Sequence, residues 1–235
     1  ARYRAVRFLD PGNLGLAGLR NAGLAAIGAR YVIFLDADDV LYPVAVAEGL
    51  RHLAANPAAG FAFGASDWTD ENLVRIAGPY ANLPRGEVLH ELLRRNLVGM
   101  HGTVMYDAAR LRSLGGFDEA TALCEDYDLY LRMAKRYPVV AHDALVAGYR
   151  QHGQNLSRDR LAILEWVLRV HARHRPVSRD RAALLAWRIG RKHWRRTYGS
   201  DPAILRNRAG RWDATRAVRL LRAAPFELLR TLVLG

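Results

Sequence analysis

The sequence has little cysteine and no long apolar run. One thiol, Cys124, excludes an internal disulfide and a metal site built from several cysteines. We expect Cys124 to be a half-buried small apolar residue. No uninterrupted apolar segment reaches the roughly 18 residues of a membrane-spanning helix, and no secretory leader pattern opens the chain. The sequence therefore favours neither a disulfide-stabilised domain nor a membrane-spanning protein.

Low-complexity tracts and fixed-period repeats are also missing. The 235 residues are 51% hydrophobic and 25% charged, which is the balance of a globular protein. A chain of this length can bury a substantial core in one or two domains.

Positive charge is concentrated at one end of the chain. The formal net charge is +12, yet residues 1–157 hold 16 Lys and Arg against 17 Asp and Glu, whereas residues 158–235 hold 19 against 6. The basic character therefore belongs to the C-terminal third.

Two kinds of sequence pattern divide the chain at the same place. Up to residue 157, short β-branched or aromatic runs alternate with helical patterns, which predicts an α/β domain with a mainly parallel sheet flanked by helices. From residue 158 to 235 the patterns are helical only, and we expect a basic helical extension. The expected strands are 5–9, 31–35, 61–65, 103–106 and 139–149, and the expected helices are 14–27, 43–55, 88–96, 125–136, 160–173, 179–198 and 213–233, with a polar loop over 68–84.

The most informative segment is 31–39, YVIFLDADD, in which an apolar strand ends in three carboxylates. The C-terminal edge of strands is where open α/β sheets bind ligands. Carboxylates so close together repel one another unless a cation neutralises them, and Mg²⁺ or Mn²⁺ suits oxygen ligands and would also bridge a diphosphate. The alternative is an acidic turn that caps a following helix.

Three blocks of sequence then suggest a family. They are 13–23 (NLGLAGLRNAG) with 28–39, then 115–119 (GGFDE) with 124–132 (CEDYDLYLR), and finally 149–157 (YRQHGQNLS). In this order they resemble the inverting family 2 glycosyltransferases with the GT-A (Rossmann-like) fold. One departure is Leu19, where that family usually has alanine.

The resemblance implies roles for the donor side of a site. Asp36 and Asp38 would bind the nucleotide-sugar donor and ligate a divalent metal, Mn²⁺ or Mg²⁺. His152 would approach the metal or the diphosphate. Arg20 and Asn21 would help to bind and orient the donor.

The resemblance also implies an acceptor side. Asp126 would be the general base for the acceptor hydroxyl, because a neutral hydroxyl is a poor nucleophile, and Glu125 would position the acceptor or the base. One carboxylate base without a covalent intermediate implies inversion at the anomeric carbon.

Each of these residues also has an ordinary structural interpretation. Glu125 and Asp126 can favour a helix N-terminus electrostatically, Arg20 can pair with a carboxylate, and His152 can be a surface histidine. Trp68 can stack on a sugar or anchor a loop.

For the whole protein, the resemblance implies a nucleotide-sugar donor, a saccharide or lipid-linked acceptor, and polysaccharide synthesis at the cell envelope. It implies a cytoplasmic location, either free or peripheral at the inner face of the membrane. The family pattern usually opens with a strand and turn that this sequence does not contain, so we expect the chain to be N-terminally truncated relative to the family.

The basic extension supports two further hypotheses. Residues 214–234 alternate arginines with apolar residues, as an interfacial helix on an anionic membrane does, with Pro225 breaking it; a helical cap packed on the catalytic domain is the alternative. Basic residues near Trp187 and Trp194 suggest a nucleic-acid surface instead, although no nucleic-acid module accompanies them. A catalytically inactive binding relative and a nucleotidyltransferase complete the alternatives.

Overall fold

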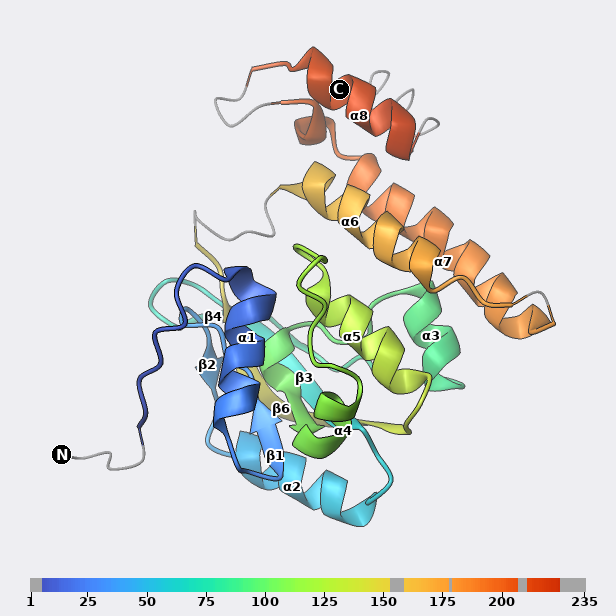
Figure 1. Cartoon of the computed structure of the whole chain (residues 1–235). Helices are drawn as coiled ribbons and strands as arrows, with labels where there is room; N and C mark the ends of the chain where they lie inside the picture. The colour runs from blue at the N-terminus through green and yellow to red at the C-terminus, as the bar shows by residue number, and fades with distance from the viewer. Residues whose placement is uncertain (1–5, 153–158, 178, 207–210, 225–235) are drawn as a thin grey trace.

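The computed structural model describes residues 6–152, 159–177, 179–206 and 211–224. The architecture is α/β, with one six-stranded sheet between helices and a further helical layer above it (Figure 1). The helices are α1 (Gly15–Ala26), α2 (Ala45–Ala55), α3 (Val88–Arg94), α4 (Ala108–Ser113), α5 (Glu125–Ala134), α6 (Arg160–Arg173), α7 (Arg181–Gly199) and α8 (Ala214–Ala223), and two short 3₁₀ helices span His101–Thr103 and Pro202–Leu205.

The strands of the sheet follow the order β1-β5-β3-β6-β2, and β4 pairs with β3. Their bounds are β1 (Tyr31–Ile33), β2 (Val40–Leu41), β3 (Phe61–Thr69), β4 (Arg75–Tyr80), β5 (Val104–Asp107) and β6 (Val139–Arg150). Strands β5 and β4 share one edge of β3, pairing with its first and its last residues respectively.

The prediction of a mainly parallel sheet is wrong for the described strands. Only β3 and β6 run parallel, and the other four pairs are antiparallel. We predicted parallel strands because strand-like runs alternate with helical patterns along the chain. That alternation gives the order of the elements along the chain but not which strands become neighbours in the sheet, where β1 pairs with β5 and β2 with β6.

Two local predictions also fail. Residues 6–9 form no strand, and their side chains are exposed, with Phe8 at 89%, because an apolar run becomes a strand only where a neighbour supplies hydrogen bonds. The polar loop expected over 68–84 contains strand β4, whose sequence RIAGPY includes Gly78 and Pro79 and therefore resembles a loop.

Alternate residues of the central strands point to opposite faces of the sheet. Phe61 and Phe63 of β3 join the main core beneath α1, α3 and α5. Ala62, between them, joins a smaller cluster with Leu53 of α2 and Met105 of β5. The sheet is therefore packed on both faces, with α2 on the second.

The helical layer shares the main core. Buried residues of α6, α7 and α8 belong to the same apolar cluster as α3 and α5. At Gly190 of α7 a side chain would overlap the carbonyl oxygen of Leu93, so the two backbones touch. The division into 1–157 and 158–235 stays a prediction, and residues 153–158 beside it lie outside the described residues.

Helix α8 confirms the expected helix up to Ala223; residues 225–235, including Pro225, lie outside the described residues. Leu220 is fully buried, and Arg219 forms a bidentate pair with Glu165 of α6 at 2.8 and 2.6 Å. Within the described ranges, no helix is both long enough and apolar enough to cross a bilayer.

Candidate active site

Residues 36–39 form a tight turn between β1 and β2. The amide of Asp39 donates to the carbonyl of Asp36 at 3.1 Å, and a strand follows instead of a helix. The helix-capping alternative for this segment is therefore wrong. The Asp39 carboxylate accepts the amide of Arg150 at 3.0 Å. Burial, aided by the two neighbouring carboxylates, raises the pKa of Asp39 to about 6.

Asp38 meets His152, which lies 114 residues later in the chain. Its Oδ2 is 2.7 Å from Nε2 of His152, and the two side chains are 40% and 24% exposed. The register between β2 and β6, with Val40 opposite Gly148, brings the two segments together. The structure thus joins the first and third blocks that the sequence analysis singled out.

Arg20 of α1 connects the turn to the start of α5. Its two terminal nitrogens donate to Asp36 at 2.8 Å and to Glu125 at 2.7 Å, and its side chain is only 7% exposed. Burial alone would lower the pKa of Arg20, but the neighbouring carboxylates Asp36, Asp126 and Glu125 raise it above its usual value. The guanidinium is a buried positive charge with carboxylates on two sides.

Glu125 and Asp126 open α5 but have different surroundings. Glu125 is buried against Arg20, whereas Asp126 is partly exposed, and its Oδ1 accepts only the amide of Tyr127, at 2.7 Å, among the described groups. Burial raises the pKa of both carboxyl groups, and their mutual repulsion adds to the rise for Glu125. Asp126 is therefore the carboxylate that a ligand can reach.

Asn21 binds the loop before α5. Its Oδ1 accepts the amide of Phe117 at 2.8 Å, and its Nδ2 donates to the Phe117 carbonyl at 2.9 Å and to Glu119 at 3.0 Å. Residue 116 must be glycine for two reasons. A side chain there would overlap the Asn21 amide oxygen, and its φ of +72° is a conformation that other residues rarely adopt. The predicted donor contact of Asn21 stays a prediction.

The predicted metal ligands are only partly assembled. Asp38 and His152 offer an oxygen and a nitrogen in contact, which fits Mn²⁺ better than the harder Mg²⁺. Asp36 instead faces Arg20. Among the described residues, these three do not form a cluster whose donor atoms all lie within 4.8 Å of one another. Asp38 and His152 are thus the pair around which an ion would bind.

Comparison with known proteins decides the family. The family model described as "Glycosyltransferase like family 2" matches residues 8–171, well over half of the chain. The chain belongs to this family.

Relatives of this glycosyltransferase include a chondroitin synthase of Escherichia coli, 24% identical over 163 residues that make up 69% of this chain and 23% of that protein. The chain thus spans about a quarter of that curated relative. The crystal structure of S. aureus TarS 1-349 in complex with UDP-GlcNAc matches with a TM-score of 0.62 and 13% identity, covering 98% of this chain and 67% of the other. A second structure of TarS 1-349 gives 0.55 and 14%, covering 93% and 63%. At these identities, the likeness establishes the GT-A fold alone.

The sequence analysis did not identify two buried groups of the candidate site. His101 lies against the Phe117 ring, and its Nδ1 is 2.8 Å from the Tyr130 hydroxyl. Its Nε2 has no hydrogen-bond partner within the described part of the chain. Burial and then the charge of Arg20 lower the pKa of His101 well below its usual value, so the ring is neutral. No sequence block contains His101, so no signal marked it.

The second missed group is Asp67 of β3, which is fully buried. It accepts hydrogen bonds from the Tyr42 hydroxyl at 2.7 Å and from Nε of Arg75 at 2.5 Å. Asp67 pairs in register with Gly148, which in turn lies opposite Val40. This network therefore supports the strands that carry the carboxylate turn.

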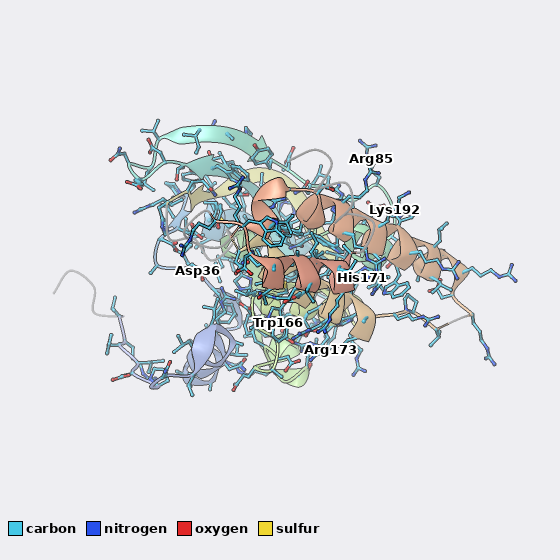
Figure 2. All side chains as sticks on the ribbon, turned by 90° about the horizontal axis from the view of Figure 1, so that it is seen from above. Asp36, Arg85, Trp166, His171, Arg173 and Lys192 are labelled. Atoms are coloured by element: carbon cyan, nitrogen blue, oxygen red, sulfur yellow. The ribbon has the colours of Figure 1, made fainter. Side chains whose placement is uncertain are left out.

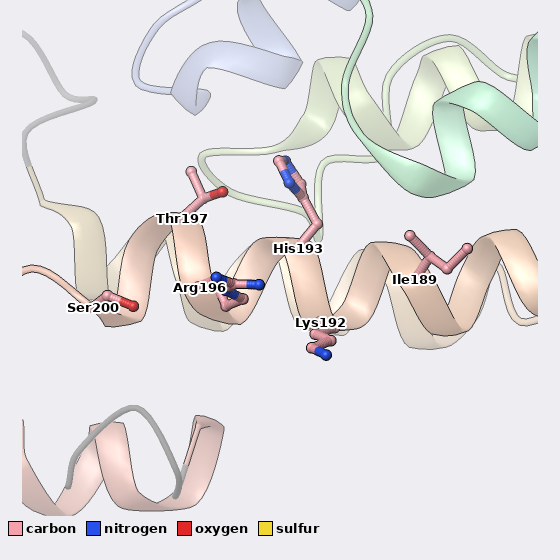
Figure 3. A pocket seen from close by; sticks show the side chains of 6 residues that line it. All are labelled: Ile189, Lys192, His193, Arg196, Thr197 and Ser200. Atoms are coloured by element: carbon pink, nitrogen blue, oxygen red, sulfur yellow. The ribbon is translucent and has the colours of Figure 1, made fainter. Parts of the chain in front are cut away.

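The basic helix α7 carries a hollow of about 700 Å³. Figure 3 shows its lining, with His193 and Thr197 on one side of the helix and Lys192 on the other. In the view from above, Asp36 and Lys192 lie on opposite sides of the molecule (Figure 2). None of the predicted site residues lines this hollow.

The two tryptophans of α7 are packing residues. Trp194 is 6% exposed, and its ring contacts Tyr127. The Trp187 indole donates to the carbonyl of His171 at 2.6 Å. Because Trp194 is buried and the partly exposed Trp187 is engaged with His171, the two rings do not support the hypothesis of a nucleic-acid surface.

The Arg20 contacts generate a stability prediction. Arg20→Ala leaves Glu125 buried without its cation, which should lower the free energy of unfolding by about 3 kcal/mol. For a chain of this size, this corresponds to a fall of roughly 6 to 12 °C in Tm. Adding Glu125→Gln should recover part of the loss. Arg51→Ala, which breaks a pair with a 63% exposed arginine, should change Tm by less than about 2 °C. Equal effects of Arg20→Ala and Arg51→Ala in calorimetry would contradict this assignment.

Proposed function

We propose that this family 2 glycosyltransferase transfers a sugar from a nucleotide-diphosphate sugar to an acceptor hydroxyl with inversion at the anomeric carbon, assisted by a divalent ion. Asp126 acts as the general base, Glu125 positions it, and Asp38, His152 and Asp36 serve the metal and the donor. The observation that carries this proposal is the double contact of Arg20, which joins the donor-side turn to the base-side helix in one site.

The different surroundings of the two carboxylates support the division of roles. Glu125 is committed to a buried ion pair and can act only by fixing the start of α5. Asp126 is partly exposed, and no described side chain hydrogen-bonds to it. Its raised pKa also brings it closer to the range in which a base is effective near neutral pH.

The proposed reaction is a single displacement. The acceptor hydroxyl loses its proton to Asp126 as its oxygen bonds to the anomeric carbon. The bond from that carbon to the phosphate oxygen breaks, and the nucleoside diphosphate leaves with the electron pair. Because attack comes from the face opposite the leaving group, the configuration inverts.

The donor side must bring three negative centres together, namely Asp36, Asp38 and the diphosphate. A bound divalent ion would neutralise this charge and that of the leaving group. Asp38 and His152 would hold the ion, and their contact and accessibility support this role. Arg20 pairs with Asp36 and would limit its repulsion with the donor.

UDP-GlcNAc is the first donor to test. The TarS structure with the TM-score of 0.62 was solved with this compound. A UDP-sugar is therefore a reasoned starting point for a panel that also includes GDP- and dTDP-sugars.

We predict that Asp126→Asn binds donor and metal normally but loses roughly 10² to 10⁴ in turnover, which is the usual contribution of a positioned base. Because the base must be ionised, the parent rate should fall as pH drops through the raised pKa of Asp126. This acidic limb should disappear in the variant.

Glu125→Gln is the matched comparison, and it should act more on Tm and on the KM of the acceptor than on turnover. Near-parental turnover of Asp126→Asn would show that the base lies elsewhere, with Asp128 the next carboxylate to test. A parent protein that binds donor without turning over any tested acceptor would favour the inactive-relative alternative.

A second prediction concerns the metal. Asp38→Ala should weaken metal-dependent donor binding by about 1 to 3 kcal/mol, the magnitude of a charge-assisted contact. Chelation should weaken the parent to the level of the variant. The control is Asp70→Ala, which removes an exposed-loop carboxylate whose Oδ1 accepts only local amides. Unchanged affinity of Asp38→Ala in calorimetry with Mn²⁺ would exclude Asp38 as a ligand.

For the helical extension, we propose peripheral contact with an anionic membrane through α8. Val218 and Leu221 are 49% and 50% exposed, whereas Arg216 and Arg219 are engaged with Asp159 and Glu165 of the α6 region. An exposed apolar pair on a helix that is fixed to the body suits insertion into an interface. Close by, a cavity of about 410 Å³ is lined by five arginines, Arg169, Arg191, Arg195, Arg219 and Arg222.

We expect the protein to sediment with vesicles containing anionic lipid at low salt and to be released as salt rises. Val218→Glu with Leu221→Glu should abolish sedimentation. Val177→Glu with Leu185→Glu makes the same charge change at exposed positions outside α8 and should reduce binding only modestly. If the parent stays in the supernatant, the packed-cap alternative is correct.

A further inference from the structure

Helix α2 presents two metal-ligating side chains to the sheet. Glu48 and His52 are separated by four residues and thus lie on one face of the helix, with Glu48 Oε2 3.7 Å from His52 Nε2. Figure 1 places α2 at the lower face of the sheet, away from α6 and α7. This face belongs to the small second core and not to the candidate active site.

Strand β6 supplies a third ligand. His142 is 7% exposed, and its ring stacks on that of His52 with the centroids 4.3 Å apart and the planes 3° from parallel. Its Nδ1 is buried and has no hydrogen-bond partner in the described part of the chain. The His142 ring fits here because residue 64 is glycine. Any larger residue would place its Cβ 2.5 Å from Cε1 of His142. A buried polar ring without a partner for one nitrogen normally requires an explanation.

The donor atoms of these three residues converge. One oxygen of Glu48 and one ring nitrogen each of His52 and His142 all lie within 4.8 Å of one another. Two ligands of a tetrahedral zinc ion, at about 2.1 Å from the metal, are about 3.4 Å apart. Closing the site requires a contraction of roughly an ångström. It also requires rotation of one imidazole out of the parallel stack, because the nitrogen lone pairs lie in the ring planes.

We propose that Glu48, His52 and His142 bind a divalent transition metal of the zinc class, with water in the fourth position. Two imidazoles and one carboxylate form a donor set that zinc accepts readily and magnesium does not. The ion would link α2 to β6 and add a fixed connection to a helix that otherwise covers its face of the sheet through small apolar contacts.

This site is distinct from the carboxylate turn. His142 lies six residues before Gly148, the residue of β6 that pairs beside the turn, and at about 3.3 Å per residue this is roughly 20 Å. An ion at one site therefore does not share ligands with an ion at the other.

Arg51 occupies the outer side of the cluster. Its Nη2 contacts Glu48 Oε2 at 2.5 Å and lies 2.8 Å from His52 Nε2. Since its side chain is 63% exposed, it can swing into solvent when a cation arrives. Arg51 is therefore a built-in competitor, and its removal should tighten metal binding.

The test uses the whole chain and the metal alone, with Zn²⁺ measured by competition with a chromophoric chelator and Co²⁺ by its visible absorption. We expect one Zn²⁺ that persists in Asp38→Ala, a tetrahedral Co²⁺ spectrum, and a rise of several degrees in Tm with excess Zn²⁺. His52→Ala and Glu48→Gln should each weaken Zn²⁺ binding by at least tenfold. Arg51→Gln should strengthen it by about threefold or more.

His193→Ala, which removes a histidine from α7, is the matched control and should leave Zn²⁺ affinity unchanged. Because the His142 ring is buried, Zn²⁺ binding by His142→Ala is interpreted only if circular dichroism shows an intact fold. The variants of the partly exposed His52 and Glu48 are the decisive test of the site. The proposal is overturned if His52→Ala and Glu48→Gln bind Zn²⁺ as the control does, or if the bound Zn²⁺ is lost in Asp38→Ala. Mn²⁺-dependent donor binding should be the same in His52→Ala as in the parent, so failure of either proposal is distinguishable from failure of the other.

Discussion

The site depends on one buried cation. Arg20 comes from a helix, Asp36 from a turn after a strand, and Glu125 from the start of another helix, and the guanidinium contacts both carboxylates at less than 3 Å. Burying any one of these charges alone would cost several kcal/mol, so each requires the others. A bidentate, planar guanidinium can serve two carboxylates at fixed angles, which the single ammonium of a lysine cannot do. The candidate active site and the connection between α1 and the start of α5 thus depend on the same contacts.

The register of the sheet brings the end of β6 to the turn at 36–39, where a metal is proposed to bind. Strand β6 runs parallel to β3 and antiparallel to β2, so its end brings Arg150 and His152 to the turn at 36–39. Asp39 is held by a backbone amide, Asp38 by an imidazole and Asp36 by a guanidinium. Three adjacent carboxylates therefore have three separate partners, which offsets the repulsion that the sequence alone implies.

Sequence patterns predicted those features that depend on local order. The spacing of apolar residues predicted α1 and α6 to within a residue or two, and the FLDADD segment placed the carboxylates at a strand end. Strand direction was predicted wrongly, because alternating strand and helix patterns do not say which strands become neighbours in the sheet. The clamp between Asn21 and Phe117 and the cluster of Glu48, His52 and His142 depend on contacts between distant segments, and no spacing in a single sequence encodes them. The prediction for Arg20 was partly right. Pairing with a carboxylate was one of its alternatives, but the sequence did not identify its two partners.

The contact between Gly190 and the Leu93 carbonyl has a consequence for how this protein can vary. Where two main chains touch, the spacing of their helices is set by the backbone and not by side chains that can repack. The outward side of α7 is then free to change its chemistry while the helix keeps its place. Members of the family could therefore diverge in the charges along α7 without moving the helix, provided that residue 190 stays glycine.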